Sequence, residues 1–189
     1  MKAATPEAPA DPAKSGTEAK SASTLVNGVD KNNATRIYPR KLNFSLKFSL
    51  DEESSNGNWK WESSGEEAAA LVSKVIWLEV TGEKEVDPTK KYEVKFKVSL
   101  KEESSPTEWE NIPLYVMARR GKKRDYCWKK FVLSNVTGKG SEREIGLVID
   151  KVASNDDEDK KLYFGLYDIW SGKLKKGLAI HYASVQEIP

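Results

Sequence analysis

The sequence is poor in the residues that enzymes most often use for catalysis. Its 189 residues include one histidine, His181, and one cysteine, Cys127. A Ser-His or Cys-His site would need that single histidine, and a lone histidine in an apolar strand such as Leu178–Tyr182 is more often structural. No Cys/His cluster has zinc-ligand spacing, and no glycine-rich phosphate loop occurs. We therefore predict a protein that is not an enzyme and that uses no cofactor or metal.

The one run that superficially resembles a metal loop is acidic. Oxygen-bearing side chains fill positions 155–159, as in calcium loops. Lys160, however, stands where an EF-hand requires glycine, and no glutamate follows at the closing position. The run is more typical of a solvated acidic loop.

Long apolar runs are also missing, because every apolar stretch is interrupted by Lys, Glu or Gly. This pattern predicts no membrane span. The first residues lack the apolar segment of a signal peptide, and a single cysteine cannot form an internal disulfide. We therefore expect a cytoplasmic and nuclear location. The 31 basic and 29 acidic residues give a net charge of +2, too small to argue for nucleic-acid binding by itself.

Aromatic residues are absent from the first 35 positions, which are rich in Ala, Pro, Ser, Thr, Lys and Glu. Such a segment cannot bury enough apolar surface to offset the entropy lost on ordering. We predict a disordered tail over residues 1–35, followed by one folded domain over residues 36–189.

The rest of the chain shows the two-residue period of half-buried strands. In the segment Tyr92–Leu100, apolar residues alternate with Glu, Lys and Ser. Further strands are expected at 42–50, 75–80, 112–118, 128–133, 144–149, 162–169 and 178–185, with turn signals that include Thr81-Gly82 between them. Short, half-wet strands favour an all-β fold, an antiparallel, jelly-roll-like β-sandwich. Segment 66–73 fits either a short helix or an extended strand.

Two tryptophans follow a turn signal at Asn56-Gly57. In an extended segment, Trp59 and Trp61 project from the same face. Exposed indoles stack against the apolar faces of sugar rings, whereas buried ones close a core, and large aromatics serve both purposes. The sequence leaves these two roles open for Trp59 and Trp61.

A basic cluster lies between two of the expected strands. It contains Arg119, Arg120, Lys122, Lys123 and Arg124. A cluster of this kind serves nuclear import or binds nucleic-acid phosphates, but it is also common at a solvated hairpin tip. The hairpin tip is the favoured interpretation, because no stacking platform of the usual RNA-binding kinds surrounds it.

Three stretches together resemble the phloem protein 2 lectins of plants, the family of the Nictaba-type lectins. Asn58–Trp61 is similar to the family's Tyr-Trp-x-Trp motif, Val75–Val98 to its central strand pair, and Leu162–Val185 to its closing Trp-Lys-x-Gly-Leu strands. The resemblance implies a jelly-roll sandwich without catalytic residues, often dimeric, in cytoplasm and nucleus. It also implies binding of N-acetylglucosamine oligomers or the N-glycan core, with Trp59 and Trp61 at the carbohydrate site. Trp77 lies inside an expected strand with apolar neighbours, so we predict it in the core.

The sequence departs from the family pattern at two aromatic positions. A tryptophan that many members carry before the Tyr-Trp-x-Trp motif is Leu46 here, or Phe48 in a shifted register. The tryptophan before Lys175 is Leu174, although Trp170 lies four residues earlier. The first hypothesis is therefore a nucleocytoplasmic lectin for N-acetylglucosamine-containing glycans. The alternative is a phloem structural or carrier protein, present in phloem sap, that binds protein or RNA partners and has little sugar affinity.

Overall fold

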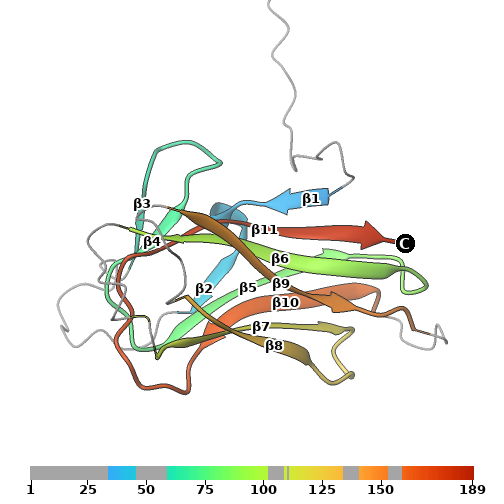
Figure 1. Ribbon diagram of the computed structural model, residues 1–189. Coiled ribbons are helices and arrows are strands. Elements are labelled where there is room, and N and C mark those ends of the chain that lie inside the picture. The colour runs from blue at the N-terminus through green and yellow to red at the C-terminus, as the bar shows by residue number, and fades with distance from the viewer. Residues whose placement is uncertain (1–33, 46–58, 102–108, 110, 134–140, 153–158) are drawn as a thin grey trace, which may run out of the picture.

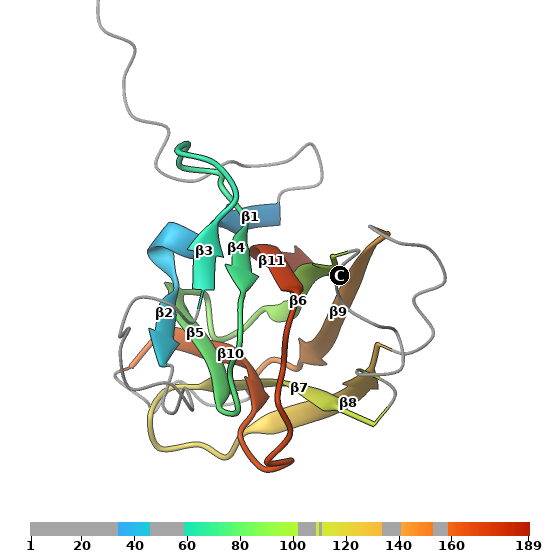
Figure 2. The same cartoon turned by 90° about the vertical axis from the view of Figure 1, so that its left-hand side faces the viewer.

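The all-β prediction is confirmed by a computed structural model in which two antiparallel sheets stack face to face (Figures 1 and 2). The structure describes residues 34–45, 59–101, 109, 111–133, 141–152 and 159–189. In the described part of the chain, no helix is long and apolar enough to cross a membrane. The predicted acidic loop, apart from Asp159, lies outside these residues.

Sheet A has the strand order β3-β4-β11-β6-β9, and β1 also pairs with β11. Its strands are β1 (Ala34–Ile37), β3 (Trp59–Trp61), β4 (Ala70–Val72), β6 (Lys91–Leu100), β9 (Glu142–Ile149) and β11 (Leu178–Ile188). The long central strands β6 and β11 pair over almost their whole length, with one register shift between Ile180 and Tyr182.

Sheet B has the strand order β2-β5-β10-β7-β8. Its strands are β2 (Asn43–Ser45), β5 (Leu78–Glu85), β7 (Pro113–Arg120), β8 (Cys127–Val132) and β10 (Lys161–Asp168). A single turn of 3-10 helix, η1 (Pro39–Lys41), joins β1 of sheet A to β2 of sheet B. In this strand order, β2 and β8 are the two edge strands of sheet B.

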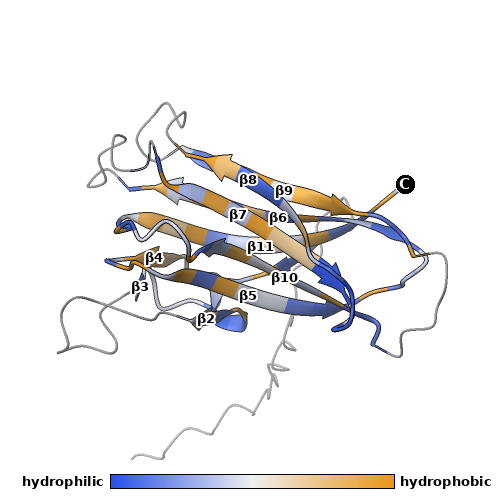
Figure 3. Cartoon of the chain, turned by 90° about the horizontal axis from the view of Figure 1, so that it is seen from below, coloured by the Kyte–Doolittle hydropathy of each residue, from blue (hydrophilic) through white to orange (hydrophobic). Residues whose placement is uncertain are grey.

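The core lies between the two sheets and is built by strand alternation, which is visible as changing colour along the strands in Figure 3. In β6 the buried side chains are those at every second position from Tyr92 to Leu100, as the sequence predicts. They face buried residues of β10 in the other sheet, and Phe96 contacts Phe164 edge to face at 6.1 Å between ring centroids. Burial of these apolar side chains is the main stabilising contribution.

Segment 66–73 contains no helix: its residues Ala70–Val72 form β4, which pairs with β3 on one side and β11 on the other, and residues 66–67 lie in a turn. The turn predicted at Thr81-Gly82 was wrong: β5 runs through both residues to Glu85. Gly82 marks a close approach of side chains instead. A Cβ at this position would lie 2.6 Å from the ring of Phe164 and 2.9 Å from Leu42 Cδ2.

The first described strand, β1, begins two residues before the predicted domain boundary at residue 36. Ala34 and Thr35 already belong to β1 and pair with Gln186 and Val185 of β11. The ordered domain therefore includes these two residues. The rest of the predicted tail, residues 1–33, lies outside the described residues.

Trp77 is not a core residue, contrary to the expectation from its apolar neighbours in the sequence. It precedes β5 and lies on the same side as Glu79, whereas Leu78 and Val80 are buried. The Trp77 side chain is half-buried, and its Nε1 donates a hydrogen bond to Glu79 Oε2 at 3.2 Å. The two-residue period of β5 explains the error, because it directs residues 77 and 79 outward.

Candidate functional site

Trp59 and Trp61 form an indole pair at one edge of the sandwich, where β3 of sheet A lies beside β2 of sheet B (Figure 2). They point to the same face, as predicted, and their ring centroids are 4.4 Å apart at 84°. Phe44 stacks on Trp59 at 5.2 Å and 19°, and it meets the edge of Trp61 at 6.5 Å. These contacts close the edge of the core.

Trp59 and Trp61 are both half-buried, so neither indole lies wholly in the core or fully in solvent. One face of Trp61 is covered by the Arg40 guanidinium, 4.3 Å from the ring centroid. Arg40 is itself held by a hydrogen bond from its Nε to the Gly65 carbonyl at 3.1 Å. The remaining exposed surface of the indole pair is accessible to a ligand.

A cavity of about 430 Å³ opens on the other side of β3. Its polar lining includes Lys60, which lies between the two tryptophans in sequence and points the opposite way, and Ser73. An ion pair between Lys101 and Glu62 borders it. These groups are hydrogen-bond donors and acceptors of the kind that hydroxyl-rich ligands require.

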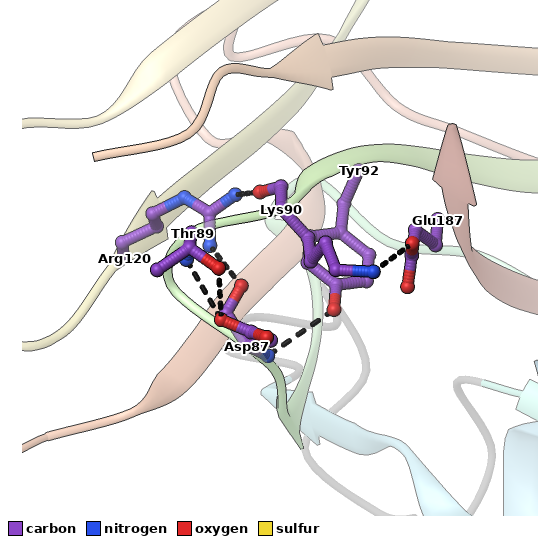
Figure 4. A network of polar contacts seen from close by, with 6 residues as sticks. All are labelled: Asp87, Thr89, Lys90, Tyr92, Arg120 and Glu187. Atoms are coloured by element: carbon purple, nitrogen blue, oxygen red, sulfur yellow. Dashed lines mark hydrogen bonds and ion pairs between the residues drawn. The ribbon is translucent and has the colours of Figure 1, made fainter. Parts of the chain in front are cut away.

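The predicted basic cluster is divided by the fold. Arg120 is only 6% exposed, at the end of β7, and its guanidinium is occupied by backbone carbonyls. Arg120 Nε donates to Asp150 O at 2.9 Å, and the other nitrogens bond to the carbonyls of Asp87 and Lys90 (Figure 4). Strand alternation explains this burial, because Arg120 follows the inward positions of β7. Arg120 therefore joins the β5–β6 turn to the sandwich and is not part of an exposed basic surface.

The other four residues of the basic cluster also separate into two groups. Arg119 points outward from sheet B and stacks over the ring of Tyr126 at 4.5 Å. Lys122, Lys123 and Arg124 are exposed in the turn between β7 and β8, which places them at a hairpin tip as favoured from the sequence. Of the five residues of the predicted cluster, these three lie together as exposed cations.

His181 lies on the outer face of sheet A at the register shift in β11. Its Nε2 is 2.8 Å from Ser99 Oγ, and its Nδ1 is 3.9 Å from Glu142 Oε1. These are the residue types of a hydrolytic triad, but Ser99 is only 5% exposed and lies in β6 between two pairing strands. A hydroxyl this deeply enclosed between paired strands is poorly placed to reach a substrate carbonyl. The arrangement favours a structural histidine.

We expect His181 to make the stability of the fold fall at mildly acidic pH. Burial lowers the pKa of its imidazole from the ordinary 6.5, although Glu142 and Glu62 act in the opposite direction. The unfolded chain then binds more protons, so the free energy of unfolding decreases as the pH falls from about 6.5 to the folded-state pKa. Urea unfolding from pH 7.5 to 5 measures this slope, and His181→Gln should flatten it. An equal slope in the two proteins would contradict the assignment.

The outer face of sheet B carries an aromatic surface that the sequence did not single out. Tyr115 of β7 lies between two exposed tryptophans, Trp128 of β8 and Trp170 of the β10–β11 loop. The centroid distances are 5.9 Å from Tyr115 to Trp128 and 5.4 Å from Tyr115 to Trp170. We call these three residues the aromatic strip. The sequence alone could have indicated one member of the strip, because the two-residue alternation of β7 places Tyr115 on the outer face.

The loop that carries Trp170 is anchored by a buried ion pair. Lys175 and Asp168 are both 0% exposed, and Lys175 Nζ lies 2.9 Å from Asp168 Oδ2. Lys175 Nζ also donates to the carbonyl of Ile76. Asp168 in turn accepts hydrogen bonds from the backbone N–H and the hydroxyl of Ser171. Burial lowers the pKa of the Lys175 ammonium, although Asp168 acts in the opposite direction.

Comparison with known proteins places these features in a family. A family model for phloem protein 2 matches residues 36–186, which include the indole pair, the aromatic strip and Lys175. The chain belongs to the phloem protein 2 family. It is also 36% identical over 133 residues to Protein PHLOEM PROTEIN 2-LIKE A9 of Arabidopsis thaliana, an alignment that covers 63% of this chain and 72% of that protein.

Solved structures that resemble this phloem protein 2 chain include carbohydrate-binding modules. One is TmCBM61 in complex with β-1,4-galactotriose, with a TM-score of 0.47, 8% identity, and coverage of 80% of this chain and 91% of that chain. Another is a family 35 module from Clostridium thermocellum, with a TM-score of 0.43, 11% identity, and coverage of 80% and 96%. Both likenesses are of fold only.

Of the positions where this sequence departs from the expected family motifs, the structure describes Leu174 but not Leu46 or Phe48. Leu174, which replaces a family tryptophan, is 43% exposed in the same loop as Trp170. Lys175, the next family position, forms the buried ion pair. Leu46 and Phe48 lie outside the described residues.

Proposed function

We propose that this phloem protein 2 chain is a lectin that binds glycans containing N-acetylglucosamine, either its oligomers or the N-glycan core. The observation that carries the proposal is the half-buried indole pair, which stands at the family's Tyr-Trp-x-Trp position. Its exposed surface offers aromatic rings to the apolar face of a sugar, and Arg40 is a hydrogen-bond donor beside it. The lectin acts in cytoplasm, nucleus and phloem sap, without a catalytic step.

Titration with chitotriose tests this function. Aromatic stacking of bases contributes about 1–3 kcal/mol per ring, and stacking of a sugar on Trp59 or Trp61 is expected to be of similar size. Replacing either tryptophan by alanine should therefore weaken binding by about tenfold or more. Val148→Ala is the matched control, because Val148 is an exposed apolar side chain on β9, at the edge of sheet A opposite β3. Unchanged affinity in Trp59→Ala and Trp61→Ala, with both variants folded, would remove the indole pair from the site.

The alternative function, a phloem structural or carrier protein that binds RNA or other phloem proteins, has a narrower basis. Arg120 is buried beneath backbone carbonyls and Arg119 stacks on Tyr126, so three cations of the predicted patch remain exposed together. A homodimer, which the family resemblance implies, stays a prediction.

A further inference from the structure

The outer faces of the two sheets differ in chemical character. Sheet A presents lysines that are paired with carboxylates, such as Lys95 with Glu93 and Lys97 with Glu142. Its polar groups are therefore largely satisfied by one another. The outer face of sheet B instead presents aromatic rings, several of which come from neighbouring strands.

Strand register brings these rings together in rows across sheet B. Tyr167 of β10 stands beside Tyr115 of β7, and Tyr163 beside Arg119. Trp128 of β8 stands beside Met117. Tyr167 also extends over Gly165, where a Cβ would lie 2.6 Å from its ring, so glycine allows the ring to lie flat along the sheet. The result is a continuous aromatic surface on the outside of the sandwich.

The two tryptophans of the aromatic strip do not serve the core. Trp128 is 62% exposed and Trp170 is 61% exposed, so most of each indole surface is in contact with water. Both meet Tyr115 at steep interplanar angles, 63° for Trp128 and 81° for Trp170. Exposed aromatic groups that gather in this way mark interaction surfaces on soluble proteins.

A buried ion pair between Asp168 and Lys175 holds the loop that carries Trp170. Asp168 and Lys175 begin and end the segment that carries Trp170, and each is fully buried in the ion pair. Burying two charges carries a large desolvation penalty, which their mutual attraction and the hydrogen bonds from Ser171 and to Ile76 O offset. A rigid loop that holds an exposed ring reduces the entropy lost when a ligand binds.

We propose that the aromatic strip is a second glycan-binding surface, which accepts an extended oligosaccharide. This inference rests on the proposed lectin function. Sugar rings would stack on Trp128 and Trp170, and hydroxyl groups would meet Lys130, which is exposed and stands beside Tyr115 in the register. A neutral, hydroxyl-rich partner suits this face better than an aliphatic protein surface, because its rings lie among charged and hydroxyl groups.

The indole pair and the Trp128 end of the aromatic strip lie at opposite edges of sheet B. Phe44 of β2 marks the indole-pair edge of sheet B, and Trp128 lies on β8 at the opposite edge. Four strand spacings separate these edges, on the order of 19 Å. A single chain would therefore bind two glycan chains and could cross-link them without dimerising.

Isothermal titration with chitotriose, which is too short to span both edges of sheet B, tests the second surface by stoichiometry. The full chain is expected to bind two ligands, and Trp128→Ala/Trp170→Ala should leave one. Each single change should weaken binding at the strip by about tenfold, the size expected from aromatic stacking. Lys129→Ala is the matched control, because Lys129 is on the same strand and points to the other side. Both tryptophans are exposed, so circular dichroism should show unchanged folding.

The outcomes separate this inference from the proposed function. One bound ligand that is lost in Trp59→Ala and kept in the strip double variant would overturn the strip and leave the lectin function standing. Absence of binding to the wild-type chain would overturn both. Self-association that disappears in the strip double variant, with glycan binding unchanged, would identify the strip as an interface between copies and overturn the proposal. Loss of one of two sites only in the strip variants supports it.

Discussion

Replacing Lys175 by methionine is expected to lower the free energy of unfolding by about 3–5 kcal/mol. The substitution keeps most of the side-chain volume but removes the ammonium that neutralises Asp168, and both groups are 0% exposed. It also leaves the carbonyl of Ile76 without its Lys175 donor. An unpaired buried carboxylate and an unsatisfied carbonyl both destabilise the folded state. Urea denaturation at neutral pH measures the loss.

Lys161→Met is the matched control, because Lys161 forms an ion pair with Glu83 in which both side chains are about half exposed. Exposed pairs of this kind contribute less than about 1 kcal/mol. The double variant Lys175→Met/Asp168→Asn should recover part of the loss, since no charge is left unpaired. A loss in Lys175→Met no larger than in Lys161→Met would show that the buried pair does not anchor the loop.

Replacing Trp109 by alanine is the second change with a large expected effect, a loss of about 3–5 kcal/mol in the free energy of unfolding. Trp109 is fully buried in the core, and its Nε1 donates to Lys176 O at 3.0 Å. Alanine would leave a cavity and an unsatisfied carbonyl next to the Lys175 anchor. Thermal and urea unfolding should both report the loss.

Two further tryptophan changes identify the source of that effect. Trp109→Phe keeps one aromatic ring but leaves a smaller void and removes the indole hydrogen bond, so its loss should be smaller, about 1–3 kcal/mol. Trp170→Ala, at an exposed position, should change stability by no more than about 0.5 kcal/mol. Equal losses in Trp109→Ala and Trp170→Ala would contradict the assignment of Trp109 to the core.

Much of the fold could be predicted from local pattern. Alternation over Tyr92–Leu100 predicted which side chains of β6 are buried, and the same rule placed Trp59 and Trp61 on one face. Errors occurred where the most common role of a residue type was assumed. Gly82 was predicted in a turn, because glycine is frequent there, but it lies in β5 against the ring of Phe164. Trp77, expected in the core, occupies an outward position of the same alternation.

The sequence by itself determined the class of the fold and the family, because a two-residue period and short motifs are local properties. Only the tertiary structure decided which faces meet. It placed Phe44 against the indole pair, buried Arg120 away from its basic neighbours, and joined Tyr115 to Trp128 and Trp170. It also paired Lys175 with Asp168. Alternation fixes the side of a strand on which a residue lies, but the neighbouring strand depends on long-range pairing, which the periodicity of one segment does not contain.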